Sequence, residues 1–208
     1  YCDRRRCGIV DRFFSSDFGY EKYAEYLLET PPILFQKDGK LIYTRDKKLK
    51  RIMEPAEVDN TQLEYMLSMV FPDVRTKSYI EIRMGDALPP PEAIGYIVFW
   101  KGLLYNEENL NLLYNDIQKI GKEKLLKLRH EIIHEDSNLN ILNYSLREYT
   151  LKLFNLAEKK LNEEENYFLK RLKKIIVENK NPKHKSLSLY NKNNKKEALD
   201  WCLINDKI

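Results

Sequence analysis

The sequence of 208 residues lacks the features that mark several large classes of protein. It has no run of about eighteen apolar residues, so no membrane-spanning helix is expected. Its first residues, Tyr1 to Arg6, lack the apolar segment of a signal peptide. Its three cysteines, Cys2, Cys7 and Cys202, are an odd number without a Cys-x-x-Cys spacing. This pattern favours reduced thiols in a cytoplasmic protein over a disulfide framework or a zinc site.

Charge of one sign is not in large excess either. The chain has 36 Lys and Arg against 32 Asp and Glu, a net charge of +4. This mild excess predicts a Lys-rich solubilising surface and no nucleic-acid partner. Hydrophobic residues make up 43% and charged residues 33%, which is ordinary for a folded chain long enough to enclose a core.

Residues 76 to 83 carry the most informative pattern, because they alternate like a strand with two different faces. Ile80 and Ile82 point to one face, which requires a core. The other face carries a cation, a phenol, a carboxylate and a guanidinium, from Lys77, Tyr79, Glu81 and Arg83. A half-exposed strand often shows water such a face, so a solvated surface is the plain interpretation.

The order of groups on that face favours a second interpretation. Glu81 and Arg83 are two residues apart, so a carboxylate and a guanidinium lie side by side. Mg²⁺ prefers carboxylate oxygens and often shares its ligand shell with substrate phosphates. Arginine donates planar, bidentate hydrogen bonds to phosphoryl oxygens. The pair therefore suits phosphoryl transfer, which depends on positioning and charge neutralisation.

Helical and turn patterns fill most of the remaining chain. Asp38-Gly39 between two short apolar runs predicts a β-hairpin. Apolar spacing predicts helices over residues 19–30, 49–53, 62–71, 92–104, 107–120, 122–133 and 144–179, the last being one helix or two joined near Asn162. The Asn- and Lys-rich residues 179–196 are expected to form a mobile loop before a short terminal helix. The predicted fold class is α+β, with a sheet-containing part over 1–90 and a helical part over 91–208.

The strand lies within a longer signature that resembles the plant-type glutamate–cysteine ligases. Val70 to Arg75, Lys77, Tyr79 to Arg83 and Asp86 resemble FPEVR-K-YLEMR-AD of that family. Met84 to Leu88 departs from the family's usual Gly-Ala-Asp-Gly-Gly, although Asp86 is retained.

Three further segments carry the same resemblance in the same order. Arg6 to Ile9 and Phe18 to Tyr23 resemble DPDRCGML and FGFEKY, and Phe99 to Tyr105 resembles FWVGLLYD. The match runs from about Asp3 to Asn106, so it is far more specific than a single motif.

The resemblance implies an ATP-dependent carboxylate–amine ligase with a glutamine-synthetase-like catalytic fold. Its small antiparallel sheet would carry the Glu-x-Arg strand. Such an enzyme phosphorylates the γ-carboxylate of glutamate and lets the amine of cysteine attack the acyl phosphate. The product is γ-glutamylcysteine, in the first step of glutathione synthesis, and the implied cofactors are ATP and Mg²⁺.

Carried over to matching positions, the resemblance assigns roles to particular residues. Arg83 would be catalytic, neutralising charge on the transferred phosphoryl group, and Glu81 would be a Mg²⁺ ligand. Further candidates for contacts to ATP or a substrate are Arg6, Arg75, Lys77 and Tyr79.

Members of this family are considerably longer, and their N-terminal portion supplies the other metal carboxylates and sheet strands. The chain is therefore expected to be the C-terminal part of such a ligase, with the missing N-terminal half as a partner. The alternative is a non-catalytic fragment or binding remnant that needs a partner chain.

His130-Glu131-x-x-His134 offers a different hypothesis, a zinc metalloprotease. Two histidines four residues apart on a helix share a face and can hold Zn²⁺. However, Glu135 and Asp136 follow directly, and no third ligand stands at a typical offset. Two surface histidines near a helix C-terminus, where positive charge is favoured, are the preferred interpretation.

Overall fold

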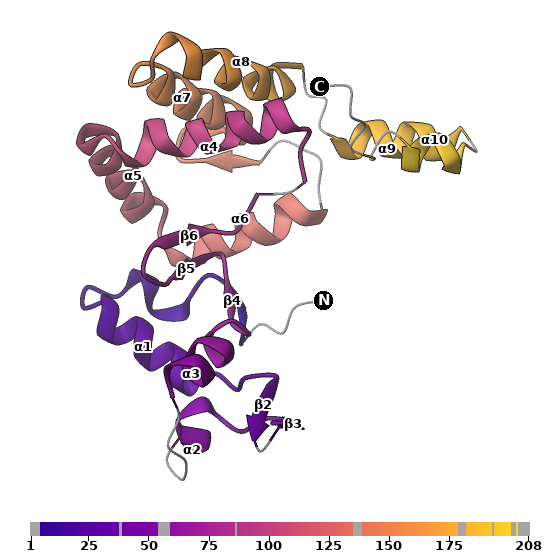
Figure 1. Ribbon diagram of the computed structural model, residues 1–208. Coiled ribbons are helices and arrows are strands. Elements are labelled where there is room, and N and C mark those ends of the chain that lie inside the picture. Colours follow the sequence, from indigo (N-terminus) through magenta and orange to yellow (C-terminus); the bar gives the residue numbers. More distant parts are fainter. Residues whose placement is uncertain are drawn as a thin grey trace. The chain divides into compact units, whose positions relative to one another are not determined.

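The computed structural model describes residues 5–37, 39–53, 59–85, 87–134, 139–178, 182–192, 194–200 and 203. Within them the fold is α+β and mostly helical, with short strands in four separate two-stranded sheets. The chain divides into two compact units, unit 1 (Tyr1–Gly85) and unit 2 (Asp86–Ile208) (Figure 1). No helix in these described ranges is long and apolar enough to cross a membrane.

Unit 1 combines short helices with three of the small sheets. Its helical elements are η1 (Asp11–Phe14), α1 (Tyr20–Glu29), α2 (Leu49–Met53) and α3 (Asn60–Leu67). Its strands are β1 (Cys7–Gly8), β2 (Leu34–Lys37), β3 (Lys40–Tyr43), β4 (Phe71–Pro72), β5 (Val74–Thr76) and β6 (Ile80–Ile82). β1 pairs with β4 in parallel, whereas β2–β3 and β5–β6 are antiparallel.

The predicted hairpin is confirmed as β2 and β3. Gly39, just before β3, has φ +74°, a left-handed conformation that glycine adopts without steric cost. Behind the hairpin, a small core of Leu49, Ile52 and Met66 joins α2 to α3. Phe35 of β2 packs against this core, which anchors the hairpin to the helices.

Unit 2 is built almost wholly of helices. They are α4 (Pro90–Leu104), α5 (Glu107–Ile120), α6 (Lys122–His134), α7 (Leu146–Glu158), α8 (Glu163–Glu178), α9 (Pro182–Asn191) and α10 (Lys195–Asp200). The two-residue strands β7 (Asn140–Ile141) and β8 (Tyr144–Ser145) form an antiparallel pair just before α7.

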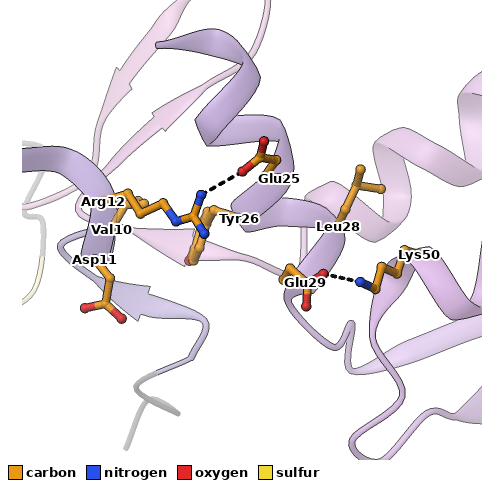
Figure 2. A pocket seen from close by; sticks show the side chains of 8 residues that line it. All are labelled: Val10, Asp11, Arg12, Glu25, Tyr26, Leu28, Glu29 and Lys50. Atoms are coloured by element: carbon orange, nitrogen blue, oxygen red, sulfur yellow. Dashed lines mark hydrogen bonds and ion pairs between the residues drawn. The ribbon is translucent and has the colours of Figure 1, made fainter. Parts of the chain in front are cut away.

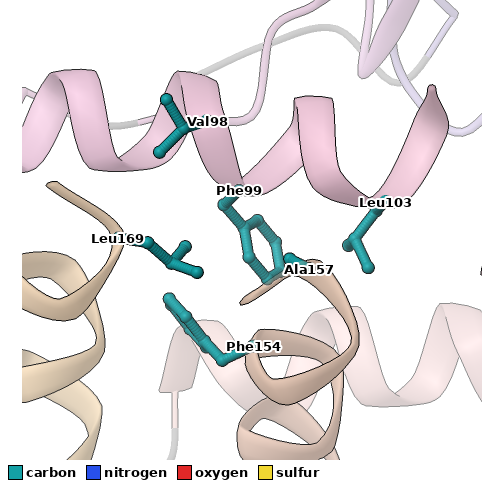
Figure 3. Close-up of a cluster of buried hydrophobic side chains, with 6 residues drawn as sticks. All are labelled: Val98, Phe99, Leu103, Phe154, Ala157 and Leu169. Atoms are coloured by element: carbon teal, nitrogen blue, oxygen red, sulfur yellow. The ribbon is translucent and has the colours of Figure 1, made fainter. Parts of the chain in front are cut away.

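The main core of unit 2 lies where α4 packs against α7 and α8 (Figure 3). Phe99 and Phe154 face each other there, with ring centroids 4.6 Å apart. Leu103 and Leu169 are almost fully buried beside them. Large apolar side chains from three helices thus meet in one cluster, which accounts for the strongly apolar sequence of α4.

Two glycines allow α4 to approach its neighbours closely. A Cβ atom added at Gly102 would lie 2.8 Å from the backbone of Ala157 on α7. One added at Gly95 would lie 2.6 Å from the carbonyl oxygen of Phe168 on α8. The absence of a side chain at these positions is therefore a packing requirement.

Several element predictions differ from the structure. Residues 76 to 83 do not form one strand, because Lys77 to Tyr79 make the turn between β5 and β6. The helix predicted over 62–71 is α3, which ends at Leu67 and is followed by β4. The predicted loop 179–196 contains α9, because Pro182 occupies the first helical position, where its missing N–H has no cost.

Cys7 also differs from its prediction. It is disulfide-bonded in the structure, whereas a reduced thiol was expected. Cys2 and Cys202 lie outside the described residues.

Candidate functional site

The turn between β5 and β6 sets which charged side chains meet. The antiparallel register pairs Arg75 with Glu81 directly across the hairpin. Beyond the end of β6, the backbone N–H of Arg83 donates to the carbonyl oxygen of Asp73, at 2.9 Å. Arg75, Glu81 and Arg83 therefore occupy alternate positions of one ladder and share a face of the hairpin.

The Glu81 carboxylate is held by two guanidinium groups. Arg75 Nε donates to Glu81 Oε2 at 2.7 Å, and Arg83 Nη1 donates to Glu81 Oε1 at 3.0 Å. Each carboxylate oxygen thus accepts a charge-assisted hydrogen bond, the stronger class of such bonds. The predicted neighbours Glu81 and Arg83 are together, and the sequence did not indicate that Arg75 would join them.

Arg75 is the most deeply placed member of this group, at 8% exposed. Its Nη1 also faces the carbonyl oxygens of Ser68 (3.3 Å) and Val70 (3.4 Å), just after α3. An arginine that makes these contacts is anchored, because moving it would leave buried acceptors unpaired. Its predicted contact to ATP or substrate would require it to give up these bonds.

Arg83 is the more accessible of the two arginines, with 27% of its side chain exposed. Its guanidinium carbon lies 5.5 Å from the centroid of the Phe71 ring, within the range of a cation–π contact. Phe71 and Glu81 therefore orient Arg83 from two directions.

The two arginines change the acidity of the carboxyl group between them. The hydrogen bond from Arg75 lowers the pKa of Glu81, and the charges of Arg75, Arg83 and Lys77 lower it further, against a smaller opposing effect of burial. Glu81 is accordingly ionised near neutral pH. The neighbouring Tyr23, whose hydroxyl accepts from the Thr76 N–H at 3.2 Å, has its pKa raised mainly by burial.

The remaining predicted site residues lie apart from this group in the contacts they make. Arg6 Nε donates to the carbonyl oxygen of Pro31, at 2.7 Å. Lys77 and Tyr79 lie in the hairpin turn and are not part of a strand, although they were predicted to share a strand face with Glu81. Of the two, Lys77 acts on Glu81 through its charge.

The residues around Glu81 do not fit a metal ion by themselves. Mg²⁺ needs several oxygen ligands, and both oxygens of Glu81 already accept from arginine. Among the residues that the structure describes, no group of three His, Cys, Asp or Glu is placed to hold a metal. Asp86, the nearest acidic residue along the family signature, lies outside those residues.

The zinc-protease motif lies on α6, as predicted. Glu131, its would-be base, is 3.5 Å from Lys127 Nζ one turn earlier. The side chain of His134 is outside the described part of the chain. A zinc determination on the purified protein tests this hypothesis, and tight stoichiometric zinc would support it.

A cavity of about 450 Å³ lies elsewhere in unit 1, beside α1 (Figure 2). The cations of its lining are paired with carboxylates, since Arg12 Nη1 binds Glu25 at 2.8 Å and Lys50 binds Glu29. Hydrogen bonds from Lys48 and Lys50 lower the pKa of Glu29 to about 2. None of the predicted site residues lines this cavity, and its cations are already neutralised.

Comparisons with known proteins identify the same family that the sequence segments resemble. A family model described as glutamate-cysteine ligase family 2 matches residues 1–198. Glutamate–cysteine ligase A, chloroplastic, of Oryza sativa subsp. japonica is 26% identical over 198 residues, covering 90% of this chain and 40% of the rice protein.

Two further relatives show the same relationship. The chloroplastic glutamate–cysteine ligase of Nicotiana tabacum is 26% identical over 198 residues, covering 90% of this chain and 38% of its own length. That of Brassica juncea is 30% identical over 115 residues, covering 52% and 22% respectively. The chain spans about 40% of the length of the rice relative.

Proposed function

Because the chain belongs to glutamate-cysteine ligase family 2, we propose that it is the C-terminal part of an ATP-dependent ligase that joins glutamate to cysteine. The observation that carries this proposal is the family match over residues 1–198. The grouping of Glu81 and Arg83 beside the β5–β6 hairpin supports it, because both belong to the matching signature.

The proposed reaction has two steps. The γ-carboxylate of glutamate attacks the terminal phosphorus of ATP, which forms an acyl phosphate and releases ADP. The amine of cysteine then attacks the acyl carbon, and phosphate leaves as γ-glutamylcysteine forms. Arg83 would meet the negative charge on the transferred phosphoryl group, since a planar guanidinium matches phosphoryl oxygens.

The other predicted contact residues differ in how accessible they are to a ligand at the hairpin. Lys77 and Tyr79 lie next to Arg83's hairpin and are available to a ligand there, whereas Arg6 is bonded to Pro31. A glutamine-synthetase-like sheet would require strands beyond β5 and β6, which the two-stranded hairpin does not have within the described residues.

Mg²⁺ remains a cofactor expected from the family, with Glu81 as its predicted ligand. Since Glu81 is held by two arginines, the described residues of this chain do not supply a magnesium site by themselves.

A partner that completes the sheet is part of the proposal. Val74 and Ile80, on the hairpin face opposite Glu81, are 42% and 66% exposed. Two-stranded hairpins are marginally stable in water, and an apolar face normally lies on a core. The portion of the relatives that this chain does not span is the partner that fits, because it makes up about 60% of the rice protein's length.

The test is a phosphate-release assay on the full-length protein that contains these residues. ATP, glutamate and a panel of amino acids are supplied, and the proposal expects release that depends on glutamate and is highest with cysteine. Release that is independent of glutamate would contradict it.

The second candidate is a non-catalytic remnant that binds a partner chain, which is favoured by the pairing of both Glu81 oxygens with arginines, because that pairing leaves no free metal ligand in this group. Calorimetry of ATP binding to the 208-residue chain, with and without Mg²⁺, separates the two candidates. A remnant binds no nucleotide under either condition.

The location of the protein is proposed to be cytoplasmic. The relatives from rice, tobacco and Brassica juncea are described as chloroplastic, which is a property of those proteins. Fluorescent fusion of the full-length protein would decide between the two compartments.

A further inference from the structure

The charges around Glu81 favour an anion over a metal ion. Arg75 and Arg83 contact the Glu81 carboxylate, and the charge of Lys77 also reaches it. Two arginines in contact with Glu81 and one nearby lysine charge thus act on a single negative group. Such an excess repels a divalent cation and attracts a phosphate or carboxylate.

Arg75 holds Glu81 in place from the interior. It is nearly buried, and its Nη1 faces the carbonyl oxygens of Ser68 and Val70 while its Nε donates to Glu81. The Arg75 guanidinium is thus attached to the backbone that follows α3. The Glu81 oxygen that Arg75 binds therefore has a defined position.

The second oxygen of Glu81 fixes the position of the Arg83 guanidinium in turn. Arg83 Nη1 donates to it at 3.0 Å, and the guanidinium also lies against the Phe71 ring. Arginine has five N–H donors. In the described part of the chain, Glu81 is the only hydrogen-bond acceptor of the Arg83 guanidinium, so its other N–H groups remain for a ligand.

We infer that Glu81 is a positioning residue, fixed by Arg75, that orients the Arg83 guanidinium toward a phosphoryl group instead of ligating a metal ion. This inference rests on the proposed function for the identity of the anion. The orientation of Arg83 by Glu81 does not depend on that function and can be measured separately.

The first test measures pyrophosphate binding to the 208-residue chain by calorimetry in the presence of EDTA. In Glu81→Gln, binding should weaken about tenfold, the cost of one charge-assisted hydrogen bond. If Glu81 acted only through its charge, removing that charge would instead tighten binding. Tighter or unchanged binding in this variant therefore overturns the inference.

Two further variants separate charge from position. Glu81→Asp keeps the charge but shortens the side chain, so it should weaken binding as Glu81→Gln does. Glu64→Gln on α3 removes an equal charge from an exposed carboxylate and should leave binding within twofold. Circular dichroism confirms that each variant is folded.

A titration with Mg²⁺ alone tests the opposing assignment. Stoichiometric Mg²⁺ binding by the wild-type chain, lost in Glu81→Gln, would overturn the inference and restore Glu81 as a ligand. Absence of saturable binding supports the inference.

The second test needs no variant and no ligand. Nitrogen-15 NMR of the arginine side chains should show restricted guanidinium rotation for both Arg75 and Arg83 in the wild-type chain. Free rotation of Arg83 overturns the inference. Restricted rotation without pyrophosphate binding would instead leave the inference standing and count against the proposed function.

Discussion

In the proposed reaction, the guanidinium of Arg83 neutralises charge on the transferred phosphoryl group. In the full-length protein, Arg83→Ala should lower kcat for phosphate release at least about a hundredfold, because a donor aimed at developing charge is worth that much or more. Arg83→Lys keeps the charge but not the planar, forked guanidinium. Its kcat should therefore lie between those of the wild type and Arg83→Ala.

The assay for Arg83 is initial-rate phosphate release with ATP, glutamate and cysteine. Lys47→Ala, which removes an exposed cation of unit 1, serves as the control and should leave kcat unchanged. Unchanged turnover in Arg83→Ala would remove this residue from the mechanism.

The lowered pKa of Glu81 makes its stabilising contacts sensitive to acid. A carboxyl group whose pKa is lower in the folded state stabilises the protein above its unfolded value of about 4.3. That contribution is lost as the pH falls through the folded-state pKa. The stability difference between wild type and Glu81→Gln should therefore shrink between pH 6 and pH 3, as measured by urea denaturation.

The pH experiment needs a comparison with a carboxylate that has no such partner. Glu64→Gln should show a difference from wild type that stays small at every pH. A Glu81→Gln difference that does not vary with pH would mean that Glu81 is not paired in solution.

Part of the candidate site could be predicted from sequence. A spacing of two residues was enough to expect Glu81 beside Arg83, and the structure brings them together. Arg75 could not be placed, because its partner depends on the hairpin register. The sequence signal that could have placed it is that Arg75 and Glu81 are the same number of residues from Ser78, the middle of the turn. A hairpin centred on Ser78 pairs these two residues.

At the scale of elements, the close approach of α4 to α7 gives a sharp prediction. Gly102→Ala puts a methyl group 2.8 Å from the Ala157 backbone, which must shift. Overpacking of this kind costs about 1–3 kcal/mol. The free energy of unfolding, measured by urea denaturation, should fall accordingly.

A matched control for Gly102→Ala exists on the same helix. Ile97 is 66% exposed on the face of α4 away from the core, so Ile97→Ala should change stability by about 0.5 kcal/mol or less. Equal losses for the two variants would contradict the close packing of α4 on α7.

The predictability of the elements followed the strength of their apolar periodicity. The helix over 107–120 was predicted to the residue, since Asn106 caps it and Gly121 ends it. The single strand predicted over residues 76–83 was wrong, because alternation of polar and apolar residues occurs in a hairpin strand and in its turn alike. α9 was missed because it has no buried residues, so no apolar stripe indicated it.

At the scale of the whole molecule, the two units have separate cores. Met66→Ala should destabilise unit 1 and Leu169→Ala should destabilise unit 2, each by about 2–5 kcal/mol, since both side chains are almost fully buried. Amide hydrogen exchange, read residue by residue, measures each unit separately. Faster exchange in both units after either substitution would show that they unfold together.

The extent of the chain bears directly on its proposed activity. It spans about 40% of the rice ligase, and its described residues bring one carboxylate and two arginines together without a metal cluster. Family membership could be recognised from short ordered motifs. The completeness of the proposed site could not be predicted, because ligands supplied by residues outside these 208 would leave no signal in their sequence.

The open side of the β5–β6 hairpin has a practical consequence. Alternation along the ladder turns the N–H and C=O groups of Ile80 and Ile82 away from β5, and β6 has no second neighbour among the described strands. An unshielded strand edge beside exposed apolar side chains is a template for pairing with identical molecules. Solutions of the isolated chain will therefore self-associate as concentration rises, and a lysine introduced at position 80 is the simplest way to keep them monomeric.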